Sequence, residues 1–170
     1  MNVPELRTER LVMRGFREED LDALAEISAD GEVTRWVGDP DGLSREETWR
    51  RMAYFIGHWE LRGFGLWAVE EQATRGLVGR IGCYEPEGWP GFEIGYVLAR
   101  EAWGRGYARE GVAAALAYAR GALGRDEIIS LIRPDNRASI AVAEHFGARR
   151  TRTVELFGAA SEVYTYPLSG

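Results

Sequence analysis

The spacing of apolar and polar residues changes along the chain, and each change marks a predicted element. Residues 9–16 alternate between apolar and polar side chains, which predicts a first strand. Residues 17–29 and 44–63 place their apolar positions on one face of a helix. The second of these helices opens on Ser44 with Glu47 three residues later, the spacing of a capping box.

The rest of the chain combines strands and helices in a different order. Residues 64–72 and 77–85 predict an antiparallel hairpin, because only a short connection joins them. A third strand, an alanine-rich helix and a nearly all-apolar strand follow within residues 92–133, and this unit has the length of a crossover between parallel strands. A further helix (134–147) and a terminal hairpin (148–168) complete the chain.

These elements predict a single domain over residues 1–170 with a mixed α/β sheet. The expected sheet has six to seven mostly antiparallel strands, one central parallel β-α-β unit and about four helices.

Composition removes several functions. All 21 basic residues are arginine, which excludes a Schiff-base lysine and the lysine of a Walker A loop. The net charge of -6 argues against a nucleic-acid surface and suggests tolerance for a cationic partner. Cys83 is the only cysteine, and His58 and His145 lack the spacing of metal ligands, so neither a disulfide nor a metal is predicted. The first residues lack the apolar core of a secretory signal, and no apolar run is long enough to span a membrane, so we expect a cytoplasmic protein without membrane contact.

The stretch WGRGYARE, residues 103–110, joins the third strand to the alanine-rich helix. A helix N-terminus offers free N–H groups and a partial positive charge, and glycines let a backbone approach an anion. Spacing alone favours a plain turn at Gly104 and Gly106 and a phosphate cradle equally. Two nucleotide loops fail here. Arg109 stands where a dinucleotide fingerprint needs Gly or Ala, and a Walker A loop requires lysine.

Three segments, in the same order along the chain, resemble N-acetyltransferases of the GNAT superfamily. Residues 103–108 are similar to the family's Q/R-x-x-G-x-G/A loop, with Trp103 in the first position as in the branch that contains RimJ and RimL. ERLVMRGFREEDLDAL (9–24) resembles the usual opening of that branch, and RPDNRASIAVAEHFGAR (133–149) resembles its second signature. The likeness covers essentially the whole chain.

This resemblance implies acetyl-CoA as co-substrate, with no metal. Amides of the loop would hold the pyrophosphate, the strand before it would pair its backbone with the pantetheine arm, and the later helix would line the other side. The residues implied by this likeness are Gly104, Arg105, Gly106, Tyr107 and Ala108 on the loop, Tyr96, Val97 and Leu98 on the strand, and Asn136 and Ser139 on the helix.

Acetyl transfer also needs a neutral amine, a polarised carbonyl and a proton for the departing thiolate. Glu93 lies where the family often places a base carboxylate, and the alternative is a partly exposed strand residue. The family's tyrosine acid is replaced by Ala143, which leaves Ser139 as the nearest substitute unless it only bonds backbone at the helix start. A backbone amide near Val97 is expected to polarise the carbonyl.

The resemblance therefore implies an acetyl-CoA-dependent N-acetyltransferase that acts by direct transfer in a ternary complex. The acceptor is a primary amine, either a protein N-terminus such as that of a ribosomal protein or a small molecule. A non-catalytic acyl-CoA-binding or regulatory module on the same fold is the alternative. Neither nucleic acid nor membrane is expected as a partner, and a homodimer is one arrangement left open.

Overall fold

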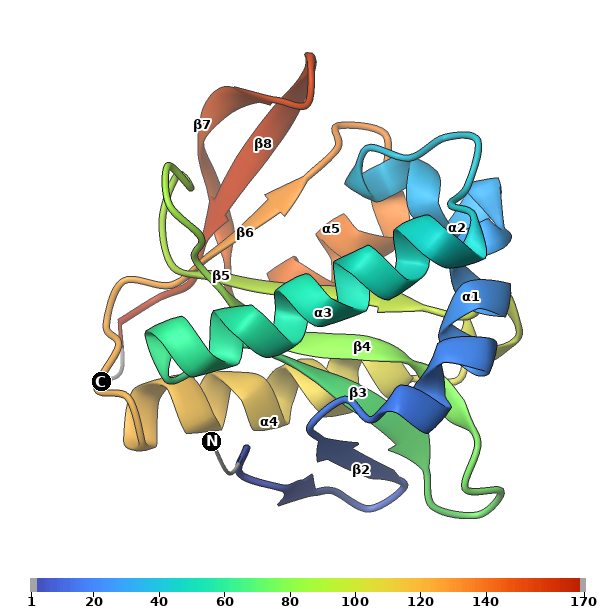
Figure 1. The fold of residues 1–170 in the computed structure, drawn as a ribbon. Helices are drawn as coiled ribbons and strands as arrows, with labels where there is room; N and C mark the ends of the chain where they lie inside the picture. Colours follow the sequence, from blue (N-terminus) through green and yellow to red (C-terminus); the bar gives the residue numbers. More distant parts are fainter. Residues whose placement is uncertain (1–2, 169–170) are drawn as a thin grey trace.

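One sheet runs through the computed structural model, which describes residues 3–168, and helices cover both of its faces (Figure 1). The strand order is β1-β2-β3-β4-β5-β6-β8-β7, and every neighbouring pair is antiparallel except β5 with β6. The strands are β1 (Leu6–Arg7), β2 (Leu11–Arg14), β3 (Leu66–Glu71), β4 (Leu77–Tyr84), β5 (Glu93–Leu98), β6 (Ile129–Ile132), β7 (Arg149–Leu156) and β8 (Ala159–Thr165). The helices are α1 (Leu21–Ala29), α2 (Gly31–Thr34), α3 (Arg45–Arg62), α4 (Tyr107–Gly121) and α5 (Arg137–His145).

The predicted mixed sheet with one parallel unit is confirmed, since β5 and β6 are joined by α4 and pair in parallel. The strand count is eight rather than six to seven. The additional strand is β1, only two residues long, which pairs with β2. The predicted helices correspond to α1, α3, α4 and α5, and α2 adds a helix of four residues.

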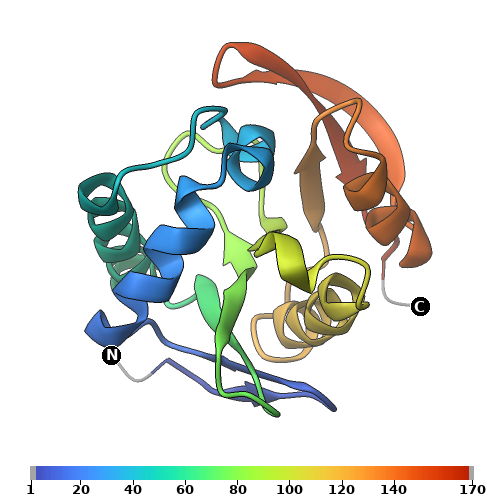
Figure 2. The same ribbon diagram turned by 90° about the vertical axis from the view of Figure 1, so that its right-hand side faces the viewer.

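The two faces of the sheet bury different kinds of side chain. On β4, Arg80 lies against the ring of Phe55 on α3, whereas Ile81, its neighbour, packs against Gly111 on α4. Figure 2 shows α3 and α4 on opposite sides of the sheet. Because residues paired across antiparallel strands share a face, Val97 and Glu93 of β5 face the same side as Arg80. That side carries the charged residues discussed below.

The contact between α4 and the sheet leaves no room for a side chain at Gly111. A Cβ there would lie 2.3 Å from Cδ1 of Ile81, which is fully buried. We expect Gly111→Ala to lower the free energy of unfolding by about 1 kcal/mol, because overpacking costs about 1–3 kcal/mol and better helix propensity returns only about 0.5–1. Gly121→Ala on the same helix, where a Cβ meets nothing within 4 Å, is expected to stabilise instead. Denaturant unfolding of both variants tests this, and equal effects would contradict it.

The parallel pair separates soon after it begins. Glu93 and Ile129 form the single register pair between β5 and β6, with the Ile129 N–H donating to the Phe92 carbonyl at 2.9 Å. Ala99 donates its N–H to Val78 on the β4 side, so the alternation of a strand directs the N–H and C=O groups of Tyr96 and Leu98 toward the β6 side. Beyond Glu93, those groups have no strand beside them.

Candidate active site

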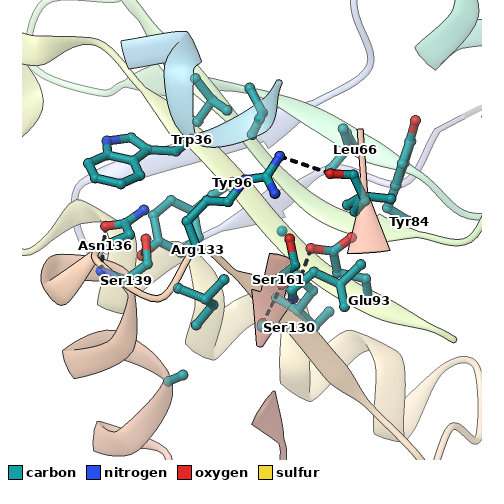
Figure 3. Close-up of a pocket in the computed structure, with 18 of the residues that line it drawn as sticks. Trp36, Leu66, Tyr84, Glu93, Tyr96, Ser130, Arg133, Asn136, Ser139 and Ser161 are labelled. Carbon is teal, nitrogen blue, oxygen red and sulfur yellow. Dashed lines mark hydrogen bonds between the residues drawn. The ribbon is translucent and has the colours of Figure 1, made fainter. Parts of the chain in front are cut away.

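Two adjoining cavities lie where β5 and β6 separate. The loop cavity, about 560 Å³, extends from residues 102–109 along β5 to α5. The Glu93 cavity, about 140 Å³, continues past Glu93 toward β4 and α3, and Figure 3 shows Glu93, Ser130 and Ser161 on neighbouring strands around it. Tyr96 and Ser139 are among the residues that line both cavities, so the two spaces meet beside these side chains.

The N-terminus of α4 opens into the loop cavity. Gly104 and Gly106 have φ angles of +71° and +83°, a left-handed backbone that favours glycine. The helix begins at Tyr107, and none of the described residues caps this end with its side chain. Free amides at the end of a 15-residue helix favour an anion.

Ionic contacts hold the same loop from its outer side. Glu71 accepts from the Tyr107 hydroxyl and, at 2.6 Å, from the Arg105 guanidinium. The Tyr107 hydrogen bond is the main reason why the pKa of Glu71 is lowered. Arg10 donates to Glu110 at 2.7 Å and to the Arg105 carbonyl at 2.8 Å. The loop is thus held in shape by contacts to β3 and to the turn before β2, without needing a ligand.

Nine of the ten residues implied as cofactor-binding line the loop cavity, and Arg105 is the exception. Its side chain points to Glu71, so its predicted role rests on its backbone amide alone. The lining members of the set are Tyr96, Val97, Leu98, Gly104, Gly106, Tyr107, Ala108, Asn136 and Ser139.

The open edge of β5 changes two further expectations: how Val97 contacts the cofactor and which amide polarises the carbonyl. The backbone of Val97 points at β4, because it alternates with the groups of Tyr96 and Leu98 that face the open side. Val97 therefore reaches the cavity through its side chain. The amides available to a ligand on this edge are those of Tyr96 and Leu98, and the expectation of a polarising amide near Val97 moves to its neighbours.

Glu93 is a buried carboxyl, 8% exposed, not a partly exposed strand residue. The indole N–H of Trp89 donates to Oε2 at 2.8 Å, and the Leu131 N–H donates to Oε1 at 3.3 Å. Burial raises the pKa of Glu93 to about 7, and these two hydrogen bonds oppose the shift. Near neutral pH the group can both accept and release a proton. Trp89 was not predicted as a site residue, because its GWPG segment indicated only a turn.

Ser139 is a partner of a tyrosine on another element. Its Oγ accepts a hydrogen bond from the Tyr96 hydroxyl at 3.0 Å, while its N–H donates to the capping side chain of Asn136 at 3.2 Å. Ala143, where the family's tyrosine would stand, is buried and lines the Glu93 cavity. Burial raises the pKa of Tyr96. The tyrosine hydroxyl beside Ser139 therefore comes from Tyr96 on β5, whereas the family's tyrosine would stand on α5.

Other chemically active side chains have structural roles. His58 is buried, with Nδ1 2.8 Å from the Phe64 carbonyl and Nε2 accepting from the Glu85 N–H at 3.2 Å, and burial lowers its pKa. Burial raises the pKa of the Cys83 thiol to about 12, which makes it inert as a nucleophile at neutral pH. Residues 3–168 contain no group of three or more His, Cys, Asp or Glu side chains suited to a metal ion. No helix among them is long and apolar enough to cross a membrane.

The charge around the cavities is opposite to that of the whole chain. Glu93 is the only carboxyl group among the lining residues. The lining arginines are Arg35, Arg109 and Arg137 in the loop cavity, and Arg51, Arg80 and Arg133 in the Glu93 cavity. The net charge of -6, which suggested a cationic partner, therefore does not describe the site.

Comparison with known proteins agrees with this architecture. Residues 10–149 match the model of the acetyltransferase (GNAT) domain, and the chain belongs to this family of N-acetyltransferases. It is 30% identical over 137 residues to an uncharacterized N-acetyltransferase, YoaA, of Bacillus subtilis (strain 168), covering 80% of this chain and 77% of YoaA.

Solved structures of acetyltransferases share the fold. The crystal structure of an acetyltransferase from Agrobacterium tumefaciens str. C58 has a TM-score of 0.86 and 30% identity, covering 98% of this chain and 95% of that one. RimL, a ribosomal L7/L12 alpha-N-protein acetyltransferase solved in complex with coenzyme A, has a TM-score of 0.77 and covers 96% of each chain. Its identity of 21% makes it a likeness of fold.

Proposed function

We propose that this acetyltransferase uses acetyl-CoA and transfers the acetyl group directly to a primary amine in a ternary complex. The observation that carries the proposal is the junction of the two cavities at Tyr96 and Ser139. One cavity suits a phosphate-bearing cofactor and the other contains a buried carboxyl, so the two substrates would meet between them.

The loop cavity fits coenzyme A in charge and shape. The uncapped N-terminus of α4 and the arginines Arg35, Arg109 and Arg137 offer positive charge for phosphates. The free edge of β5 at Tyr96 and Leu98 offers N–H and C=O groups to an amide-containing arm. When bound, acetyl-CoA would supply an acetyl thioester. The RimL structure was solved in complex with coenzyme A, and this supports coenzyme A binding by the same fold here.

Different residues of the chain would accept and donate the protons of the reaction. Glu93 accepts a proton from the acceptor ammonium, through water where the distance requires it. The hydroxyl pair of Tyr96 and Ser139, which lines both cavities, would give a proton to the departing thiolate. The amide of Tyr96 or Leu98 on the open edge is placed to polarise a carbonyl.

The pKa of Glu93 bears on the kind of amine. The α-amine of a peptide N-terminus has a pKa near ~8 and a lysine amine near ~10.4. With Glu93 at about 7, proton transfer from the ammonium of a peptide N-terminus is uphill by about one pKa unit, and from a lysine ammonium by more than three. The acceptor we propose is a primary amine, either a protein N-terminus or a small amino compound, and Glu93 accepts its proton more readily the lower the pKa of the ammonium.

Thiol release from acetyl-CoA, measured against a panel of α-amines, lysine-type amines and peptides, tests this function. We expect turnover with at least one α-amine and initial-rate patterns that intersect, because both substrates are bound before transfer. Coenzyme A binding without turnover on any acceptor would favour the non-catalytic module. A parallel-line pattern would instead indicate an acetyl-enzyme and contradict direct transfer.

A further inference from the structure

Arg80 is a buried cation without an ionic partner. Its side chain lines the Glu93 cavity and the residue is 7% exposed. Across residues 3–168 its guanidinium has neither an ion pair nor a hydrogen bond, and its carbon lies over the ring of Phe55, 5.0 Å from the ring centroid. Arg14 is equally buried, yet it has Asp20 at 2.8 Å and Glu70 at 3.1 Å. Buried charges are normally paired in this way, because an unpaired one costs several kcal/mol.

The groups around Arg80 do not neutralise it. Arg51 adds a second positive charge, and Asp39, the nearby acid, already pairs with Arg51 at 3.2 Å. Burial raises the pKa of Tyr84, so that phenol is neutral. Arg133 donates to two backbone carbonyls of the hairpin β7–β8. Desolvation lowers the pKa of Arg80 to about 10, which still leaves it charged at neutral pH.

We propose that Arg80 binds an anionic group of the acceptor, so that the substrate is a small primary amine carrying a carboxylate or a similar oxyanion, such as a free amino acid. This inference rests on the proposed acetyl transfer and narrows its acceptor. A guanidinium binds carboxylates through paired N–H donors, and a desolvated one gains more from such a partner than a surface arginine does.

The sheet register places the two ends of such a substrate. Arg80 is opposite Val97 and Glu93 is opposite Tyr84, so Arg80 and Glu93 are on one face, four residues apart along the strands. Four residues span about 13 Å along the backbone, and both side chains line the Glu93 cavity. The amine would lie on the Glu93 side and the anion on the Arg80 side.

The Glu93 cavity has room for a small acceptor. Its volume of about 140 Å³ is close to the ~150 Å³ of an engineered cavity that holds benzene. A free amino acid supplies both charges within that space, whereas the first residue of a protein chain has no carboxylate next to its amine. Peptide N-termini are therefore the competing acceptors in the test.

The test compares free amino acids that have a primary amine and no side-chain carboxylate with their amides, which keep the amine and remove the carboxylate. We expect kcat/KM of the best amino acid to exceed that of its amide by at least about 10-fold. Arg80→Gln should lower kcat/KM for the acid about 10²-fold and change that for the amide less than about 3-fold. Arg80→Lys, which keeps the charge but loses the paired donors, should lie between. For each acceptor, the ratio of kcat/KM in the variant to kcat/KM in the native protein is compared, because this ratio cancels the different basicities of the acid and the amide.

Arg50→Gln is the control, because this exposed arginine on α3 pairs with Glu46 and changes the net charge equally without lining either cavity. It should leave both acceptors unaffected. Amides or uncharged peptides acetylated as well as free amino acids would overturn the proposal, as would an equal loss for acid and amide in Arg80→Gln.

A binding measurement decides the matter even if no amine is acetylated. We expect Arg80→Gln to raise the Tm in the absence of ligand, since it removes an unpaired buried charge. Amino acids or N-acetyl amino acids, added in millimolar amounts to the coenzyme A-loaded protein, should raise the Tm of the native chain and not that of the variant. The absence of a shift with all carboxylates, or the same shift in both proteins, would overturn the assignment while leaving acetyl transfer to other amines open.

Discussion

Gly106→Glu is expected to weaken binding of coenzyme A at least about 10²-fold, because it places a carboxylate at the N-terminus of α4, where phosphates would lie. The φ angle of +83° at Gly106 strains any other residue, and a Cβ would also come within 3.3 Å of the Arg10 guanidinium. Calorimetric titration with coenzyme A measures the dissociation constant directly. Circular dichroism then shows whether the fold is retained.

Two further glycine variants separate the causes of that loss. Gly106→Ala adds the strain without the charge and should weaken binding only several-fold. Gly124→Glu adds a carboxylate at another positive-φ glycine, φ +61°, which lies in the turn after α4 and outside both cavities. It should bind coenzyme A normally. Native affinity in Gly106→Glu, or an equal loss in Gly124→Glu, would contradict a phosphate cradle at this loop.

The local pattern of the chain was sufficient to predict most of the fold. Periods of two and 3.6 residues identify the long strands and helices, and the crossover length identifies the parallel pair. β1, with two residues, and α2, with four, are too short to produce a recognisable period in the sequence. Nor can the local pattern show that β5 and β6 share a single register pair before they separate, although that separation makes the cavities.

The candidate site was predicted where it depends on one continuous segment, and missed where it depends on packing between distant ones. The glycine loop could be identified from its own residues and its likeness to a family. The contacts that hold it join Arg10 to Glu110 and Glu71 to Arg105, residues 100 and 34 positions apart. The sequence did not indicate a role for Arg80, because an arginine on a strand is unusual only if it is buried without an ionic partner, and only the structure shows that. The net charge wrongly suggested a cationic partner for the same reason, since it does not show which charged residues line a cavity.

Glu93→Gln is expected to lower kcat about 10²-fold with little change in coenzyme A affinity, because the amide cannot accept the proton of the ammonium. The carboxylate form acts as the base, and burial raises the pKa of Glu93 to about 7. The ratio of native to variant kcat should therefore increase as the pH rises through about 7 and then level off. Using this ratio removes the deprotonation of the free amine, which affects both proteins alike.

The stability of the protein supplies a second readout of the same pKa. A carboxyl whose folded pKa lies above its unfolded value of about 4.5 holds its proton longer in the native state, so stability from this group is lost as the pH rises from about 4.5 to 7. Glu93→Gln avoids that loss, and its stability relative to the native protein should grow over this range, by up to about 3 kcal/mol. Glu87→Gln, at an exposed position in the loop before β5, should show neither effect. A pH-independent rate ratio would remove Glu93 as the base, whereas a flat stability difference would show that its pKa is not raised by burial.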